Sequence, residues 1–226
     1  MTTRDDASIA DRRAPLNRER VLTAAIDLAD RSGIDALSMR KLGTELDVDA
    51  MAMYRHVRNK DDLLDGMLQA VVGSVEPALT DLPWKAALRA QAMAARSTML
   101  RHPWARRVLE ERGTGGPAQI AQIERVLAIL LSAGFSIDLA HHALHVLDSR
   151  IFGFSPALFD ETGRPQPTPE ETAALGLIIA AQFPNVAQLA GAVSHDGPLG
   201  ACDDDVEFAF GLDLILDGLE ARLRAR

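Results

Sequence analysis

The sequence predicts an all-α protein, on two observations. Ala and Leu, which favour helices, account for 36 and 30 of the 226 residues, whereas the β-branched residues Val, Ile and Thr contribute only 12, 11 and 10. No segment alternates apolar and polar residues around an Asn-Gly or Asp-Gly turn, so nothing indicates a β-hairpin. The chain divides at about Gly73: residues 1–73 carry short helical segments, and residues 74–226 carry longer, more apolar ones.

The N-terminal part is expected to hold four helices. The first is predicted over residues 17–31, and Gly33 is placed to end it. A short second helix begins after Ser38, whose hydroxyl suits an N-cap, and a turn of three residues leads to a third helix that reaches about His56. Asn59 caps a fourth. The apolar positions follow helical spacing: Leu22, Ala25, Ile26 and Ala29, then Met39, Leu42 and Leu46, then Met53 and Val57, then Leu63, Leu64, Met67, Leu68 and Val71.

Two short helices joined by a turn and braced by a longer one form a helix-turn-helix motif. With Met53 and Val57 turned inward, the third helix presents small side chains, a tyrosine and an arginine outward. Small residues allow the backbone to approach base edges, and the Tyr hydroxyl and Arg can reach phosphates or bases. Lys60 begins the next helix, where free backbone N–H groups favour a phosphate. The outward positions are Ala50, Met51, Ala52, Tyr54 and Arg55.

Two stretches resemble the tetracycline-repressor (TetR) family, and within it the tetracycline repressor class. The first runs from Ala36 to Leu42, continues through Val48 and residues 53–60, and ends at residues 63–65. It resembles the family's DNA-binding domain. The second, residues 208–220, is similar to the family's last dimerisation helix, and Trp84 and residues 134–136 also match at suitable spacing.

The resemblance implies a homodimeric transcription regulator, expected to be a repressor that binds palindromic double-stranded DNA and is released by a small-molecule effector. Arg40 stands at a position that reads guanine, and Ser38 and Lys60 stand at positions that touch phosphates. Positions 50–52 and 55 match readout positions but carry other residues, so a different operator is expected. The implied DNA-contacting set is Ser38, Arg40, Ala50, Met51, Ala52, Tyr54, Arg55, His56 and Lys60.

The net charge of −8 argues at first against a nucleic-acid partner. The charge is unevenly placed, however: residues 1–73 hold 11 basic and 13 acidic residues, and the remainder holds 13 and 19. Between Arg40 and Lys60 the local balance is positive. The first 16 residues are expected to be a flexible arm, whose Arg12 and Arg13 could add a DNA contact, although a solvated tail is favoured.

Composition bounds the cellular setting. The 47% of hydrophobic residues excludes intrinsic disorder, and the single cysteine, Cys202, leaves no internal disulfide. Residues 1–16 hold no apolar signal segment, and the longest uncharged stretch, residues 172–195, is interrupted by Gln, Asn and Pro. We therefore expect a soluble, cytoplasmic protein without membrane contact.

The second part is expected to hold ligand-binding and dimerisation helices, with a four-helix bundle across the dimer axis. Two segments carry apolar residues at 3-4-3-4 spacing, broad enough to face both an internal core and a second copy. The alternative is that both are intramolecular core only. The predicted interface residues are Ile137, Leu144, Leu147, Ile151, Leu212, Leu216, Leu219 and Leu223.

A mostly apolar ligand pocket is expected beside these segments. Where the resemblance places the drug–magnesium ligands of the repressor, this chain has residues near Leu109 and Ala157 that do not bind metal, so no metal or cofactor is expected. A stripe of His141, His145 and Asp148 could ligate a metal, but a solvated or interface histidine pair is favoured. The predicted ligand-binding residues are Gln91, Met99, Arg112, His145 and Phe152.

Two other functions stay open from the sequence. The first is a DNA-binding regulator without any effector. The second, much less favoured, is a helical metal-dependent enzyme that uses His141, His145 and Asp148. Because the chain offers no nucleophile elbow, phosphate loop or paired-carboxylate signature, no catalytic residue and no enzyme activity are expected.

Overall fold

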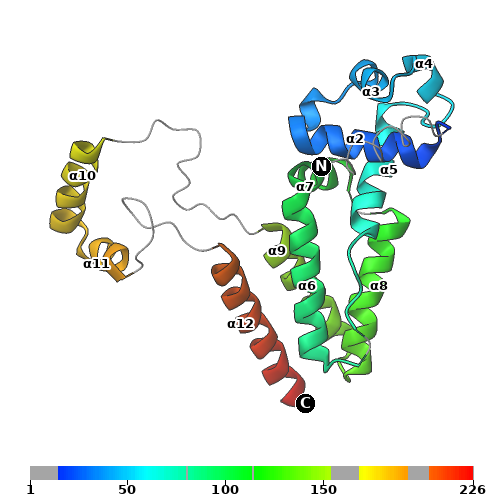
Figure 1. The fold of residues 1–226 in the computed structure, drawn as a ribbon. Helices are drawn as coiled ribbons and strands as arrows, with labels where there is room; N and C mark the ends of the chain where they lie inside the picture. Colours follow the sequence, from blue (N-terminus) through cyan, green and yellow to red (C-terminus); the bar gives the residue numbers. More distant parts are fainter. Residues whose placement is uncertain (1–14, 80, 114, 154–167, 193–203, 226) are drawn as a thin grey trace, which may run out of the picture.

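A computed structural model describes residues 15–79, 81–113, 115–153, 168–192 and 204–225. Every regular element in these residues is helical, as the composition predicts (Figure 1). The expected arm lies almost wholly outside the described residues, as do Cys202 and most of the proline-rich segment before Pro169. None of the described helices is both long enough and apolar enough to cross a bilayer.

The first N-terminal helices begin after side chains that cap them, and the cap at Ser38 was predicted. Helix α2 (Arg18–Ser32) follows Asn17, whose side chain accepts a hydrogen bond from the Arg20 amide at 2.8 Å, and it ends at Gly33, whose φ is +78°. A 3₁₀ turn, η1 (Ile34–Ala36), leads to α3 (Met39–Leu46), capped by the Ser38 side chain. Local side chains therefore set these boundaries.

The third predicted helix is shorter than expected. Helix α4 (Ala50–Met53) has the Asp49 side chain as its N-cap and gives way to a turn over residues 54–56. Met53 and Val57 are buried, as predicted. Helix α5 (Lys60–Gly73) then begins with the Asn59 side chain accepting a hydrogen bond from the Asp62 amide at 2.8 Å.

The core of the N-terminal helices is shared with a helix from beyond Gly73. Trp104 of α7 (Pro103–Arg112) is buried in that core together with Ala105 and Val108. The Trp104 Nε1–H donates to Asp30 of α2 at 2.6 Å, and His102 Nδ1 lies 2.9 Å from the same carboxylate. Helix α7 is thus anchored to α2 by both apolar and polar contacts.

A second core lies among the long helices α6 (Trp84–Arg101), α8 (Pro117–Ser132), α9 (Ile137–Gly153) and α12 (Asp204–Arg224). The Trp84 and Phe135 rings meet edge to face, with centroids 5.0 Å apart. Ion pairs join α6 to α12: Arg89 to Asp213 at 2.9 Å, Arg96 to Asp205 at 2.7 Å, and Lys85 to Asp217. The buried Arg96 guanidinium also lies 4.6 Å from the Phe208 ring centroid.

Helices α10 (Pro169–Gln182) and α11 (Pro184–Ala192) pack on each other and lie apart from the other described helices at the left of Figure 1. Thr168 and Glu171 form a reciprocal capping box at the start of α10. Several large apolar side chains of this pair are exposed: Leu175, Leu177, Ile178, Phe183, Val186 and Leu189.

Candidate nucleic-acid interface and ligand cavity

Helices α3 and α4 form a tight helix-turn-helix at one end of the molecule, at the top of Figure 1. Gly43 allows this close approach, because a Cβ atom there would lie 2.9 Å from the Val48 carbonyl oxygen and 3.4 Å from the Ala50 nitrogen. Asp47 adopts the left-handed conformation with φ +54° and ends α3. The Asp49 carboxylate then accepts from the Met51 amide at 2.7 Å and starts α4.

None of the nine residues expected at DNA is buried in this chain. Met51 is 71% exposed and Tyr54 is 44% exposed, so both side chains are available to a partner. The half-buried members, Ala50, Ala52 and His56, present little side-chain surface or lie at the end of the turn. The exposed members are Ser38, Arg40, Met51, Tyr54, Arg55 and Lys60.

Among the described residues, the exposed cations of this surface are unpaired, whereas two cations of α2 are in ion pairs. Arg40, Arg55 and Lys60 have no ion pair or side-chain hydrogen bond within the described part of the chain. In contrast, Arg18 and Arg31 of α2 are paired with carboxylates at 3.0 Å and 2.7 Å. The unpaired guanidinium and ammonium groups are free to neutralise phosphates.

Arg18 and Asp62 hold the turn after α4 in place. The Arg18 guanidinium donates to both Asp62 oxygens, at 3.0 Å and 3.2 Å, and to the His56 carbonyl at 2.8 Å. The Arg58 amide donates to the same carboxylate at 2.8 Å. The hydrogen bond from Arg18, with that from the Arg58 amide, holds the pKa of Asp62 well below its usual range. The carboxylate therefore stays charged and fixes α4 against α2 and α5.

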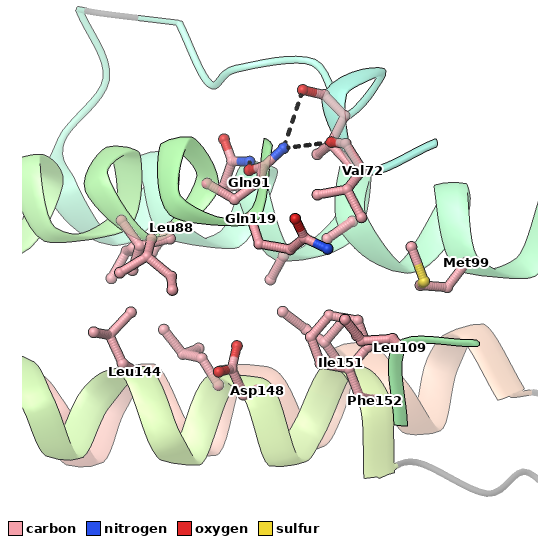
Figure 2. A pocket seen from close by; sticks show the side chains of 17 residues that line it. Val72, Leu88, Gln91, Met99, Leu109, Gln119, Leu144, Asp148, Ile151 and Phe152 are labelled. Carbon is pink, nitrogen blue, oxygen red and sulfur yellow. Dashed lines mark hydrogen bonds between the residues drawn. The ribbon is translucent and has the colours of Figure 1, made fainter. Parts of the chain in front are cut away.

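A cavity of about 110 Å³ lies between α5, α6, α8 and α9 (Figure 2). Leu88 and Met99 contribute to it from α6, Leu109 from α7, and Leu144 and Ile151 from α9. Ligand sites in proteins are concave and mostly apolar with a few polar groups that orient the ligand. This cavity has that character.

Two amide side chains of the cavity wall, Gln91 and Gln122, are linked to each other and to the backbone. The Ala78 amide donates to Gln91 Oε1 at 3.1 Å, Gln91 Nε2 donates to Gln122 Oε1 at 2.8 Å, and Gln122 Nε2 donates to the Val72 carbonyl at 3.0 Å. Because a backbone donor begins this series and a backbone acceptor ends it, both amide orientations are fixed. Helix α8 is thereby attached to the last turn of α5 (Figure 2).

Gln119 is fixed in the same way. The Ala118 amide donates to Gln69 Oε1 at 2.7 Å, and Gln69 Nε2 donates to Gln119 Oε1. Gln119 Nε2 therefore remains a donor without a partner within the described residues. Gln119 and Gln122 were not among the ligand-binding residues predicted from the sequence. Their spacing of three on one helix could have placed them on a common face.

Among the described residues that line the cavity, Asp148 is the one ionisable residue, and it is exposed in the single chain. Its carboxylate points from α9 toward the helices on the opposite side in Figure 2. It makes no hydrogen bond or ion pair with the residues that the structure describes. Desolvation by the surrounding protein raises the pKa of Asp148, and the charge of the nearby His145 acts in the opposite direction.

The structure brings together only part of the expected ligand set. Gln91, Met99 and Phe152 line the cavity. Arg112 does not: its guanidinium pairs with Asp61 at 3.0 Å and with Asp65, because the end of α7 lies against the start of α5. His145 is also outside the lining and is exposed, since Asp148 and Phe152 occupy the cavity side of α9. Arg112 and His145 therefore lie outside the lining of this cavity.

The residues expected at the dimer interface differ in their exposure in the single chain. Leu147, Leu212, Leu216 and Leu219 are buried within the single chain, where α9 and α12 pack on each other and on α6. Leu144, Ile151 and Leu223 are half-buried, and Ile137 is 68% exposed. The four buried leucines are therefore unavailable to a second copy. The exposed apolar stripe of α12 consists instead of Val206, Phe210 and Leu214, four residues apart.

The histidine stripe does not form a metal site with its neighbours. The His141 and His145 rings meet edge to face with centroids 4.6 Å apart. Among the described residues, no three His, Cys, Asp or Glu side chains come together as a metal would require.

Two family models match the chain. The model for bacterial regulatory proteins of the tetR family matches residues 21–67, which include α3 and α4. The model for the tetracyclin repressor-like C-terminal domain matches residues 76–223, which include all four helices of the second core.

Individual relatives agree with these matches. The HTH-type transcriptional repressor DrrR1 of Streptomyces coeruleorubidus is 32% identical over 93% of this chain and 80% of its own. The class D tetracycline repressor protein of Escherichia coli is 30% identical over 94% and 93%. Among solved structures, the TetR family protein ActR of Streptomyces coelicolor in complex with actinorhodin gives a TM-score of 0.71 at 30% identity. That comparison covers 93% of this chain and 99% of ActR.

Proposed function

The chain belongs to the TetR family of bacterial regulatory proteins, and from that premise we propose that it is a homodimeric repressor that binds a palindromic operator and leaves it when a small molecule fills the cavity. As a member of this family it is a DNA-binding transcription regulator and not an enzyme. The single observation that carries the proposal is the outer face of α4, exposed between unpaired cations on α3 and α5.

The physical argument for DNA binding rests on this placement. Arg40 near the start of α3, Arg55 after α4 and Lys60 at the start of α5 flank the small residues of α4. Flanking cations suit the two phosphate backbones of a major groove, and the small residues between them allow α4 to reach base edges. Because few cations contribute, we expect moderate salt dependence and an operator chosen largely by base contacts.

The argument for a ligand response rests on the cavity and its connection to α5. A small molecule has differential affinity for two conformations if filling the cavity changes the position of α5 relative to α8. ActR, the similar protein, is in complex with actinorhodin, and such a precedent favours an effector over the alternative of a regulator without one.

Homodimerisation is needed because a two-fold axis presents two copies of α4 to a palindrome, with half-sites about 34–36 Å apart. In the proposed dimer, the exposed stripe of Val206, Phe210 and Leu214, together with Ile137, faces the second copy.

The test is selection of DNA from a random duplex library by the purified full-length protein at moderate salt. The proposal expects enrichment of a palindrome whose half-sites are about one helical turn apart, and retardation of that DNA in a gel. A Tyr54→Ala, Arg55→Ala double variant should enrich nothing. Failure of the wild-type protein to enrich any sequence above the starting library would overturn the proposal.

A further inference from the structure

Among the described residues that line the cavity, Asp148 is the one ionisable group. Thirteen of its 17 lining residues are apolar, and the four polar ones are Gln91, Gln119, Gln122 and Asp148. Two of the amides, Gln91 and Gln122, already form hydrogen bonds with each other and with backbone groups. A molecule entering the cavity therefore meets two polar atoms without protein partners in the described residues: the Asp148 carboxylate and Gln119 Nε2.

The carboxylate is the stronger of these two determinants. Asp148 is exposed in the single chain, so its carboxylate is hydrated until a ligand covers it. Covering a charge with an apolar molecule is unfavourable unless an opposite charge or hydrogen-bond donors accompany it. Desolvation by the surrounding protein raises the pKa of Asp148, and none of the described arginines or lysines pairs with its carboxylate. Residues 74–226, with 13 basic and 19 acidic residues, add a field that attracts cations and repels anions.

We propose that the cavity binds a mainly apolar organic cation, whose protonated nitrogen lies against the Asp148 carboxylate. The apolar body contacts side chains such as Leu88, Leu144 and Phe152. A carbonyl, hydroxyl or ether oxygen on that body is placed to accept from Gln119 Nε2. This assignment rests on the proposed function, because it takes the cavity to be the effector site, and it names the chemical class of that effector.

The volume of the cavity limits the size of the compounds that can test this proposal. An apolar cavity of about 150 Å³ holds a benzene ring, and the cavity here is of similar order at about 110 Å³. We would use benzylammonium, benzoate and benzyl alcohol, which share one benzene ring and differ in charge. Each is titrated into the full-length protein without DNA by isothermal titration calorimetry.

We expect the ammonium compound to bind at least tenfold more tightly than the carboxylate compound. Asp148→Asn should abolish that preference by weakening the ammonium compound about tenfold, while the alcohol changes by less than threefold. Asp138→Asn is the matched control: Asp138 is exposed on the same helix outside the cavity lining, so all three affinities should stay within threefold of the wild type. Thermal melting of each variant verifies folding, and Asp148→Glu, which keeps the charge, should retain the preference.

Three outcomes would overturn the assignment: equal or tighter binding of benzoate, an unchanged ammonium affinity in Asp148→Asn, or no binding of any probe at millimolar concentration. The DNA selection above separates the two proposals. If the protein binds an operator but shows no preference for the cation, the proposed regulator function stands and this effector class is rejected. If it binds the cation but no operator, the cation site stands and the regulator function is rejected.

Discussion

Gln122 in the wall of the cavity donates a hydrogen bond from its Nε2 atom to the backbone carbonyl of Val72 at 3.0 Å. Val72 lies in the last turn of α5, the helix that begins at Lys60 beside the exposed face of α4. The cavity wall and the proposed DNA-contacting surface are therefore connected through one continuous helix. A ligand that displaces Gln122 would act directly on the far end of α5.

Replacement of Gln122 tests the strength of this connection. Gln122→Met removes the bond to Val72 and leaves Gln91 Nε2 without its acceptor, so we expect the free energy of unfolding to fall by about 1–3 kcal/mol. Urea denaturation followed by circular dichroism measures this loss. Glu124→Met on the exposed side of the same helix should change the value by less than about 0.5 kcal/mol. Equal midpoints for the two variants would contradict the role given to Gln122.

The cations at the proposed DNA surface should have separable effects. Arg40→Ala should reduce discrimination between operator and mismatched DNA, with a loss of about 1–3 kcal/mol at the position that it reads. Lys60→Ala should weaken all sequences alike and lower the slope of log affinity against log salt by about 1. Arg106→Ala, which removes the same charge from an ion pair on α7, should do neither. Fluorescence anisotropy over a salt series distinguishes the three variants.

Asp62 should make stability depend on pH in the acid range. Its pKa is lowered in the folded protein, so its contribution is fully present above the unfolded pKa of about 3.9 and is lost as the pH falls through that value toward the folded pKa. Asp62→Asn should therefore lower the free energy of unfolding at pH 7 by about 1–3 kcal/mol and flatten its decline below pH 5.

Two arginines provide the comparison for Asp62. Arg18→Ala removes the strongest donor to the carboxylate and should reproduce much of the Asp62→Asn effect. Arg58→Ala keeps the backbone amide that donates to Asp62 and should cost less. Urea unfolding between pH 3 and pH 7 measures both. A larger effect of Arg58→Ala than of Arg18→Ala would refute this assignment.

Gly43 should tolerate no side chain. A Cβ atom there would lie 2.9 Å from the Val48 carbonyl oxygen, so Gly43→Ala must move the turn between α3 and α4. We expect a loss of about 1–3 kcal/mol of stability and weaker operator binding. Gly176→Ala is the control with the opposite sign: it lies inside α10 with open space around it, and alanine favours helix by up to about 1 kcal/mol. Thermal melting and gel retardation measure both variants.

The exposed stripe of α12 should determine the oligomeric state. Phe210→Glu and Leu214→Glu each place a charge on an apolar surface that is 63% or 58% exposed in the single chain, so they should dissociate the dimer without unfolding the monomer. Leu177→Glu, on the 74% exposed face of α10, should leave the dimer intact. Sedimentation velocity measures the mass of each species. A dimeric Phe210→Glu, Leu214→Glu double variant would place the interface elsewhere.

Local signals were sufficient for the N-terminal helices. Ser38 and Asn59 were predicted as caps, and each side chain accepts the expected backbone hydrogen bond, because a cap depends only on residues within one turn. Asn17, predicted only as the first residue of its helix, is also a cap. The burial of Met53 and Val57 also followed from helical spacing. The early end of α4 did not, since the turn after Met53 is held by Arg18 and Asp62, far away in sequence.

The long helices show the limit of spacing. A 3-4-3-4 pattern identified the apolar face of α12. The pattern could not tell whether that face packs on α6 and α9 or on a second copy, because either kind of helical partner requires the same spacing of apolar residues. Arg112 and His145, predicted in the ligand pocket, lie outside the lining of this cavity for a related reason. Their orientation depends on the carboxylates of α5 and on the rotation of α9, which no local pattern encodes.

The sequence by itself determined the helical class, the caps of the first helices and the motif by which the family is recognised, because these depend on short-range chemistry. Only the tertiary structure decided that α7 completes the N-terminal core, that Gln122 connects the cavity to α5, and that Asp148 lines the cavity without an ion pair to any described residue. Each of these relationships joins residues on helices distant in the chain, and their relative position follows from packing of whole helices rather than from the identity of any neighbouring residue.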